Sequence, residues 1–203
     1  MNIRRILLFV SIVLVFLYFL PRYNKPVVVR NVLTNEECER ITNLATKKLQ
    51  TSTVSKDRDI DKTVRKSETA WLARSDDPTV DKLVRKCVSM TDRPLGNCED
   101  LQVLKYKPGG FYKPHQDTFK DDDNRRMYTF IIALNDDYEG GETAFPHLNK
   151  KFKMERGDVL FFDTLNNYNF MTKKALHGGN PVKSGEKWIC NLWVHKYPFK
   201  STV

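Results

Sequence analysis

Cysteine and histidine are scarce in this chain, with four of each among 203 residues. No Cys-x-x-Cys pair and no other zinc-ligand spacing is present, which argues against a zinc site. Internal repeats and low-complexity segments are also absent. The content of 40% hydrophobic and 11% aromatic residues argues against a disordered chain, and the length suits one domain with a sizeable core.

The four cysteines fit either a reducing or an oxidising compartment. Cys87 and Cys98 could close a short disulfide loop if the domain lies in the lumen of the secretory pathway, where disulfides persist. Cys38 has no evident partner. Cys190 lies in an apolar strand pattern, which indicates a buried thiol.

The net charge of the chain is +9, but its last two thirds have almost no excess of positive charge. Residues 1–66 carry 13 Lys and Arg against 6 Asp and Glu, whereas residues 67–203 carry 21 against 19. A protein that binds phosphates more often places its positive charge beside the binding site. We therefore expect no nucleic-acid partner, and we attribute the excess to solubility and to the flanks of a membrane segment.

A hydrophobic run of full membrane-spanning length is missing as well. Residues 6–20 are uncharged, but fifteen residues are short of the roughly 20 that a spanning helix needs. No small-x-small cleavage site follows. We expect an uncleaved signal-anchor, with Arg4 and Arg5 on the cytosolic side and the rest of the chain in the lumen of the endoplasmic reticulum. A cleaved signal peptide and a buried core helix are the alternatives.

The pattern of the remaining chain predicts two helices followed by many short strands. Thr34 or Asn35 caps a helix that runs to about residue 50, and Asp77 caps a second helix that runs to about residue 90. A short strand is expected within residues 25–33. Strands rich in β-branched, aromatic and aliphatic residues are expected at 101–106, 111–115, 127–135, 142–145, 159–162 and 188–195. Without βαβ alternation, this order indicates a mainly β sandwich or jelly roll braced by helices.

The segment around His115 and Asp117 carries the most specific chemical signal. These residues stand two apart, so on an extended strand both side chains leave the same face. An imidazole and a carboxylate on one face supply two ligands of the 2-His-1-carboxylate triad, which holds non-heme Fe(II) and leaves positions open for oxygen and a co-substrate.

The third ligand must be one of the other histidines, His147, His177 or His195. His147 sits in a turn-like Phe-Pro-His-Leu context, which favours a surface histidine. His177 stands before Gly178-Gly179, so it can project from a strand end into a cavity while the backbone bends away.

Ten residues after His177, Lys187 opens an apolar strand. A lysine there is costly unless its ammonium has an anionic partner. A dicarboxylate co-substrate would supply one, since one end could chelate iron while the far carboxylate pairs with Lys187. An ordinary exposed lysine at a strand end is the alternative.

The order His115-x-Asp117, His177, Lys187 resembles that of the 2-oxoglutarate- and Fe(II)-dependent dioxygenases. More narrowly, the stretch from about residue 65 to 195 is similar to the catalytic domain of prolyl 4-hydroxylases. The matching phrases are LQVLKY at 101–106, GGFYKPHQD at 109–117, YEGGETAFP at 138–146 and KWICNLWVH at 187–195.

The resemblance implies a double-stranded β-helix (jelly-roll) core, with Fe(II) bound by His115, Asp117 and His177. It also implies 2-oxoglutarate, O2 and L-ascorbate as co-substrates and cofactors. Lys187 would bind the far carboxylate of 2-oxoglutarate, in a pocket lined by three further residues, Tyr106, Thr143 and Trp193. Proline in a peptide would be hydroxylated while 2-oxoglutarate is decarboxylated to succinate.

The same resemblance implies a groove for a proline-rich peptide or protein. The positions that would face the peptide are Arg65, Ser67, Trp71, Glu99, Tyr112, Arg126 and His195. Extended polyproline segments dock on aromatic surfaces with few polar anchors, so this set is chemically reasonable. Core packing is the alternative for the two aromatic residues and the histidine, and a surface position is the alternative for Arg126.

Three regions are therefore expected. Residues 1–21 form the signal-anchor or signal peptide, residues 22–66 form a linker, a helix and a mobile loop at 51–66, and residues 67–203 form the catalytic domain. The short acidic segment after Asp117 and the unusual stretch at 163–176 depart from the family pattern and leave the substrate open. A same-fold oxygenase acting on peptidyl lysine or a nucleic-acid base, and a non-catalytic binding module, are the alternatives. The oligomeric state is also open.

Overall fold

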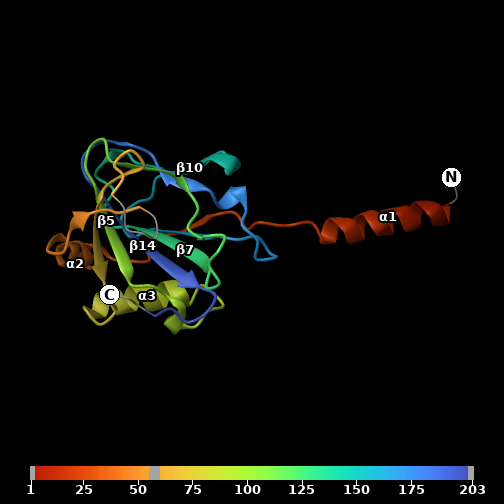
Figure 1. Cartoon of the computed structure of the whole chain (residues 1–203), viewed down its shortest axis with the longest axis horizontal. Coiled ribbons are helices and arrows are strands. Elements are labelled where there is room, and N and C mark those ends of the chain that lie inside the picture. The colour runs from red at the N-terminus through yellow and green to blue at the C-terminus, as the bar shows by residue number, and fades with distance from the viewer. Residues whose placement is uncertain (1–2, 55–59, 201–203) are drawn as a thin grey trace.

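The computed structural model describes residues 3–54 and 60–200, and strands dominate its globular part (Figure 1). The strands are β1 Val27–Val29, β2 Gln50–Thr51, β3 Arg65–Lys66, β4 Glu68–Leu72, β5 Leu101–Tyr106, β6 Phe111–His115, β7 Arg126–Ala133, β8 Glu139–Gly140, β9 Thr143–Phe145, β10 Lys150–Phe152, β11 Val159–Asp163, β12 His177–Gly179, β13 Val182–Ser184 and β14 Lys187–His195. The helices are α1 Ile3–Tyr18, α2 Asn35–Thr46 and α3 Pro78–Val88, with short 3-10 turns η1 Leu95–Asn97, η2 Pro146–Leu148 and η3 Lys173–Ala175.

Two antiparallel sheets form the body of the domain. The larger sheet has the order β1-β11-β7-β14-β5-β4-β2, and the smaller one has the order β10-β9-β12-β6-β3. A separate two-stranded ribbon joins β13 and β8. The mainly β architecture with bracing helices is therefore confirmed.

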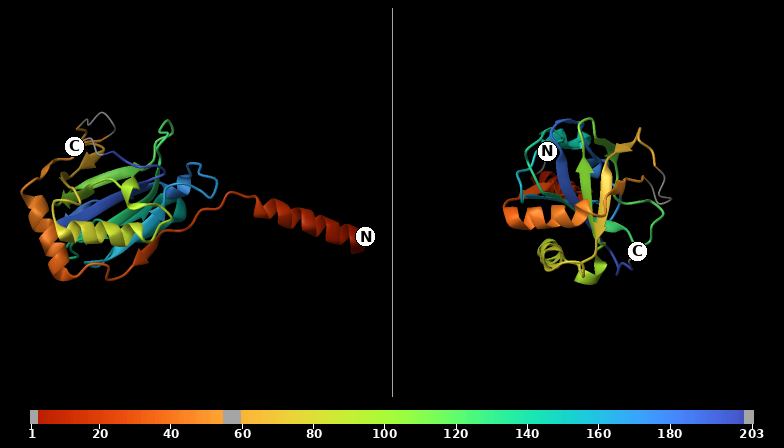
Figure 2. Two further views of the ribbon diagram at one scale, coloured as in Figure 1. Left: turned by 90° about the horizontal axis from the view of Figure 1, so that it is seen from below. Right: turned by 90° about the vertical axis from the view of Figure 1, so that its left-hand side faces the viewer.

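Helices α2 and α3 cover one face of the larger sheet (Figure 2). Thr34 accepts a hydrogen bond from the backbone N–H of Glu37, whose carboxylate accepts one from the N–H of Thr34, so a capping box starts α2. Asp77 accepts from the N–H of Thr79 and starts α3. Both predicted starts are confirmed, although the helices end about two to four residues earlier than predicted.

The two-residue period of the strands divides β14 between two cores. Trp188, Cys190 and Leu192 face the helices, whereas Ile189 belongs to the core between the sheets. Lys187, Asn191, Trp193 and His195 share the parity of Ile189 and therefore lie on the inner face of the larger sheet. The functional side chains of β14 are thus aimed at the second sheet.

Several predicted strands have the expected bounds, and others shift by one or two residues. β5 and β6 match the prediction, while β7 begins at Arg126 and ends at Ala133 instead of spanning 127–135. The prediction missed the five-residue strand β4 and the short strands β2, β3, β8, β10, β12 and β13. Strands of two or three residues offer too few positions for a period to be recognised.

The region at 51–66 was predicted as a mobile loop, but its ends belong to strands. Thr51 is in β2, and Arg65 and Lys66 form β3. Residues 55–59 of the predicted loop lie outside the described residues. The division into three regions stays a prediction.

The N-terminal helix α1 projects away from the globular part (Figures 1 and 2). Within residues 3–54 and 60–200, no helix combines the length and the hydropathy that a membrane span requires. The alternative of a buried core helix is wrong, because the described side chains of α1 are exposed. Cys87 and Cys98 both carry free thiols, so the disulfide considered above is not formed in the structure.

Candidate metal centre and binding cleft

Two neighbouring strands of the smaller sheet bring the predicted ligands together. β12 pairs with β6, and His177 lies directly opposite His115 in this register. Asp117 follows β6 by two residues. One ligand atom each from His115, Asp117 and His177 lies within 4.8 Å of the others. The residue types and their clustering fit a 2-His-1-carboxylate site for Fe(II).

Backbone carbonyls orient both imidazole rings. His115 Nδ1 lies 2.9 Å from the carbonyl of Lys113, and His177 Nδ1 lies 3.1 Å from the carbonyl of Ala175. Because a carbonyl oxygen only accepts, Nδ1 carries the proton in each ring and Nε2 keeps its lone pair. Both Nε2 atoms face Asp117: that of His115 lies 3.3 Å from Oδ1, and that of His177 lies 3.6 Å from Oδ2. Each ring therefore presents a ligating nitrogen to the centre.

The carboxylate of Asp117 is buried but remains ionised. Burial alone would raise its pKa, but the positive charge that His177 or His115 carries when protonated, together with the charge of Arg126, holds the pKa well below its usual range. Thr129 donates a hydrogen bond of 2.7 Å to Oδ2. Burial lowers the pKa of His177 to about 4, so its ring is neutral at physiological pH. Neutral imidazole and ionised carboxylate are the forms that bind a metal.

A charged network lies behind the metal ligands. Arg126 contacts both carboxylate oxygens of Glu99, at 2.5 and 3.0 Å, and donates from its third nitrogen to the backbone carbonyl of Asp117 at 3.2 Å. Glu99 is also 2.8 Å from His195 Nε2. Burial would raise the pKa of Glu99, but His195 and Arg126 outweigh it and lower the pKa. The network thus ties the segment that carries Asp117 to the larger sheet.

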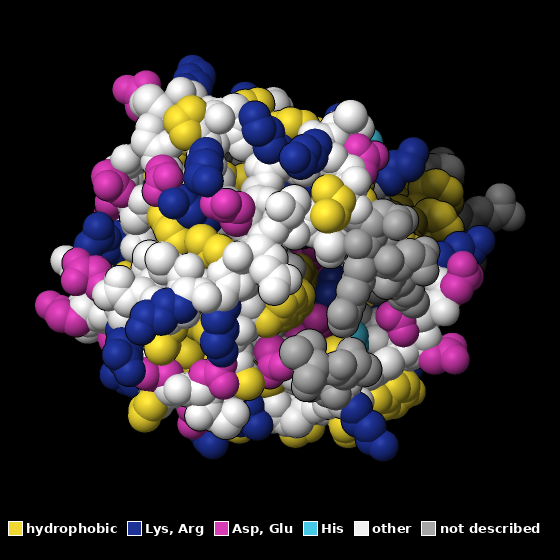
Figure 3. All heavy atoms as spheres, turned by 60° about the vertical axis from the view of Figure 1, so that its left-hand side comes forward, with side chains coloured by type: hydrophobic (Ala, Val, Ile, Leu, Met, Phe, Trp, Pro, Cys, Tyr) yellow, Lys and Arg dark blue, Asp and Glu magenta, His cyan; other side chains and the backbone are white. Residues whose placement is uncertain are grey.

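A cleft of about 720 Å³ opens beside the metal ligands. The wall of the cleft includes the metal ligands His115 and Asp117, and several aromatic side chains. The aromatic residues are Trp71, Tyr112, Phe119, Trp193 and Phe199. Figure 3 shows one face of the molecule hollowed near its centre, where hydrophobic and acidic side chains lie together.

Most residues predicted to face a peptide border this cleft. Arg65, Trp71, Glu99, Tyr112 and Arg126 line it. The guanidinium of Arg65 lies 4.6 Å from the centre of the Tyr112 ring. The other two members of the set do not line the cleft. Ser67 accepts a hydrogen bond from Arg65 Nε at 3.1 Å, and His195 lies behind Glu99. Their roles toward a peptide stay predictions.

Lys187 occupies the interior, as predicted from its place at the start of an apolar strand. It is 3% exposed, and its ammonium donates to the carbonyl of Gly141 at 2.6 Å. No carboxylate within residues 3–54 and 60–200 forms an ion pair with it. Burial lowers its pKa to about 8, with Glu142 acting in the opposite direction. A buried ammonium without a counterion fits the far carboxylate of a dicarboxylate.

The other residues assigned to that pocket lie on both sheets. Tyr106 is opposite Lys187 in the β5–β14 register, and its ring centre is 5.5 Å from the ammonium. Thr143, on β9, lies opposite Gly179, which belongs to β12, the strand that carries His177. All three are buried, and Trp193 also borders the cleft. The 2-oxoglutarate-binding role of this set remains a prediction.

The sequence interpretation missed three polar residues on the inner face of the larger sheet. Gln102 and Asn191 line the cleft and contact each other at 3.3 Å, and Thr129 supports Asp117. The signal was present, because each is a polar residue at an inward position of an otherwise apolar strand. By contrast, His147 is exposed in η2, as predicted for a surface histidine.

Buried polar atoms around the cleft lack partners. Gln116 Oε1, Asn191 Oδ1 and Trp193 Nε1 have no hydrogen-bond partner in the described part of the chain. All three residues line the cleft. Since buried polar groups are rarely left unsatisfied, these atoms indicate that a polar ligand completes the site.

Comparison with known proteins places these features in a family. The profile of the 2OG-Fe(II) oxygenase superfamily matches residues 101–195. A putative prolyl 4-hydroxylase of Acanthamoeba polyphaga mimivirus is 37% identical over 188 residues, covering 87% of this chain and 76% of that protein. Prolyl 4-hydroxylase 5 of Arabidopsis thaliana is 34% identical over 203 residues, covering 87% of this chain and 70% of that protein.

Solved structures agree. The viral collagen prolyl hydroxylase of Paramecium Bursaria Chlorella virus-1, solved as a 2OG complex, has a TM-score of 0.71 and 31% identity, covering 86% of this chain and 97% of that chain. A Pseudomonas putida prolyl-4-hydroxylase shares the fold with a TM-score of 0.64 at 16% identity. The jelly-roll core expected from the sequence is confirmed.

Proposed function

Since the chain belongs to the 2OG-Fe(II) oxygenase superfamily, among its prolyl 4-hydroxylase-like members, we propose that it hydroxylates proline in peptides and decarboxylates 2-oxoglutarate to succinate. The observation that carries the proposal is the combination of the His115, Asp117 and His177 cluster with the buried ammonium of Lys187. One provides a site for Fe(II), and the other provides a site for the far end of a dicarboxylate.

The protein residues have separate tasks in this reaction. His115, Asp117 and His177 would hold Fe(II), which supplies the oxidative chemistry with O2 and 2-oxoglutarate when bound. Lys187 would bind the far carboxylate and fix the direction in which 2-oxoglutarate enters. L-ascorbate is expected as the reductant that keeps the iron in its ferrous form.

The cleft would position the peptide. Its aromatic wall suits an extended polyproline segment, whose backbone carbonyls have no partners of their own. Trp193 Nε1 could donate to such a carbonyl, and Asn191 Oδ1 could accept from the N–H of a non-proline residue of the peptide. Close packing of peptide against Trp71 and Tyr112 would exclude water from the metal ligands.

Membrane attachment through α1 completes the proposal. The large apolar side chains of α1 are exposed, among them Phe9 at 67%, Ile12 at 58% and Phe16 at 66%. Such an exposed apolar helix is costly in water and suits lipid. We place the catalytic domain in the lumen of the endoplasmic reticulum, with α1 at its membrane, because basic residues precede the apolar run.

A substrate panel tests the proposed chemistry. The full chain, solubilised with detergent, is incubated with Fe(II), 2-oxoglutarate and ascorbate. The panel contains a proline-rich peptide, the same peptide with alanine in place of proline, a lysine-rich peptide and a single-stranded oligonucleotide. Mass spectrometry should find one added oxygen only on the proline peptide. Oxygen on lysine or on a base would reassign the substrate, and binding without any product would favour a non-catalytic module.

A further inference from the structure

Residues 165–171 form an ordered loop that holds apolar side chains in solvent; we call it the 165–171 loop. Leu165 and Met171 pair across its base, and Asn166 Oδ1 accepts hydrogen bonds from the N–H groups of Tyr168 and Phe170. Asn169 adopts φ +60°, the left-handed conformation that lets the chain turn back. The loop therefore has a defined conformation of its own.

The tip of this loop is apolar and uncovered. Phe170 is 64% exposed, Tyr168 40% and Met171 37%, whereas Leu165 is buried and anchors the base. A contiguous patch of large exposed apolar side chains usually marks an interaction surface.

Hydrogen bonds fasten the loop to the end of the apolar N-terminal segment. Asn167 exchanges two hydrogen bonds with the backbone of Arg22, at 2.6 and 3.0 Å. The Tyr168 hydroxyl donates to the carbonyl of Phe19 at 2.9 Å. Figure 2 shows α1 leaving the domain on the side where this loop lies. The apolar tip of the loop therefore lies beside the end of the apolar N-terminal segment.

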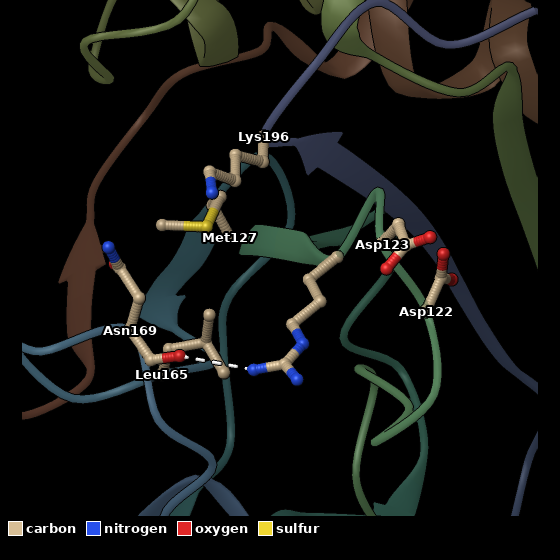
Figure 4. Close-up of a pocket in the computed structure, with 7 residues that line it drawn as sticks. Asp122, Asp123, Met127, Leu165, Asn169 and Lys196 are labelled. Atoms are coloured by element: carbon tan, nitrogen blue, oxygen red, sulfur yellow. Dashed lines mark hydrogen bonds between the residues drawn. The ribbon is translucent and has the colours of Figure 1, made fainter.

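Basic residues flank the loop, although Asp163 precedes it and Asp122 and Asp123 lie near its base. The stretch at 164–174 contains no acidic residue and ends in the exposed Lys173 and Lys174. Residues 17–26 also contain no acid and carry Arg22 and Lys25. Figure 4 shows Asp122 and Asp123 across a small pocket from Leu165 and Asn169. Aromatic tips flanked by basic residues are the composition of segments that rest in the headgroup layer of a bilayer.

We propose that the 165–171 loop inserts its tip into the headgroup layer of the membrane to which α1 attaches. The bilayer surface covers Tyr168, Phe170 and Met171, while Arg22, Lys173 and Lys174 meet the phosphate groups of the lipid headgroups. This inference rests on the proposed membrane attachment of α1. It adds a second contact, which holds the catalytic domain at one orientation to the membrane.

The contact also reaches the cleft. The backbone carbonyl of Thr172 accepts a hydrogen bond of 2.9 Å from the side-chain amide of Gln116. Gln116 lies between the metal ligands His115 and Asp117 in the sequence, and it lines the cleft. Arg125 donates to the carbonyl of Asn169 at 3.3 Å. The loop therefore links the membrane surface to the wall of the cleft, so the cleft keeps a fixed direction relative to the bilayer.

Site-specific fluorescence tests the proposal with the full chain. A polarity-sensitive thiol label is attached to Phe170→Cys, to Ile12→Cys in α1, or to Asn43→Cys in α2, which Figure 1 places at the opposite end of the molecule from α1. The native thiols are largely buried, and the unsubstituted protein gives the background. Vesicles contain phosphatidylcholine with or without phosphatidylserine, and brominated lipids serve as quenchers. Unchanged peptide turnover verifies that each variant is folded.

Blue-shifted and quenched emission at positions 12 and 170, with an aqueous signal at 43, is the expected result, and phosphatidylserine should strengthen the signal at 170. A shift at 12 alone would overturn the loop contact and leave the attachment of α1 intact. No shift at 12 or at 170 would overturn both, while turnover would still test the enzyme separately. A shift at 170 without vesicles that grows with protein concentration would assign the tip to a second copy of the chain and refute the proposal.

Discussion

Replacing Lys187 with methionine should stabilise the ligand-free protein while abolishing its affinity for 2-oxoglutarate. The side chain is 3% exposed and its ammonium has no ion-pair partner in the described residues. Methionine keeps the length of the buried stem and removes the charge. The same change removes the group expected to bind the far carboxylate of 2-oxoglutarate.

The magnitude follows from the pKa. Burial lowers the pKa of Lys187 from 10.5 to about 8, which corresponds to about 3 kcal/mol against the charged form. Loss of the hydrogen bond to Gly141 costs about 1 kcal/mol. The net gain in unfolding free energy at neutral pH is then about 2 kcal/mol, or roughly 4 to 8 °C in Tm for a chain of this size.

The pH dependence has a definite sign. The folded-state pKa of Lys187 lies below the unfolded value, so between about pH 8 and 10.5 the unfolded chain holds a proton that the folded chain has lost. The contribution of this residue to unfolding free energy therefore rises with pH through that window. Affinity for 2-oxoglutarate should fall above about pH 8, because the free protein then holds a neutral amine.

Chemical denaturation across this pH range and calorimetric titration with 2-oxoglutarate measure both effects. Lys183→Met is the matched control, since Lys183 is exposed on neighbouring β13 and should change neither quantity. A Lys187→Met protein that is less stable than the parent, or that binds 2-oxoglutarate as well as the parent, would refute the reasoning.

Three further changes probe other parts of the site. Thr129→Val removes the donor to Asp117 and should weaken Fe(II) binding about 10- to 100-fold in a metal titration, whereas unchanged affinity would exclude a supporting role. Glu99→Ala leaves Arg126 without its carboxylate and should lower the free energy of unfolding by about 3 kcal/mol in urea denaturation; a loss under 1 kcal/mol would show that the pair is weak. Asn191→Leu should raise the KM for peptide while leaving the KM for 2-oxoglutarate unchanged, and the opposite split would move this residue out of the peptide wall.

Local chemistry made part of this structure predictable. Helix caps act within three residues, so Thr34 and Asp77 could be identified without knowledge of the fold. The two-residue spacing of His115 and Asp117 likewise carries its geometric meaning within one strand. β5 and β6 were also recognisable, because enough consecutive residues have strand character and turn residues separate them.

Contacts between distant segments could not be predicted in the same way. Glu99 meets Arg126 and His195 only because the larger sheet brings three separate elements together. The sequence interpretation assigned these residues to a peptide groove through family resemblance, and pattern alone gives no sign of their mutual contacts. Similarly, β12 has three residues, two of them glycine, so its pairing with β6 depends on the tertiary fold.

Measuring succinate and hydroxyproline in the same reaction tests the central claim most directly. Full-length protein is incubated with a proline-rich peptide, Fe(II), 2-oxoglutarate and ascorbate, and succinate and hydroxyproline are quantified in the same sample. We expect equal amounts of both from the parent chain and neither from His177→Ala, whose Fe(II) affinity is measured separately. Hydroxyproline formed without 2-oxoglutarate, or full activity in His177→Ala, would contradict the assignment.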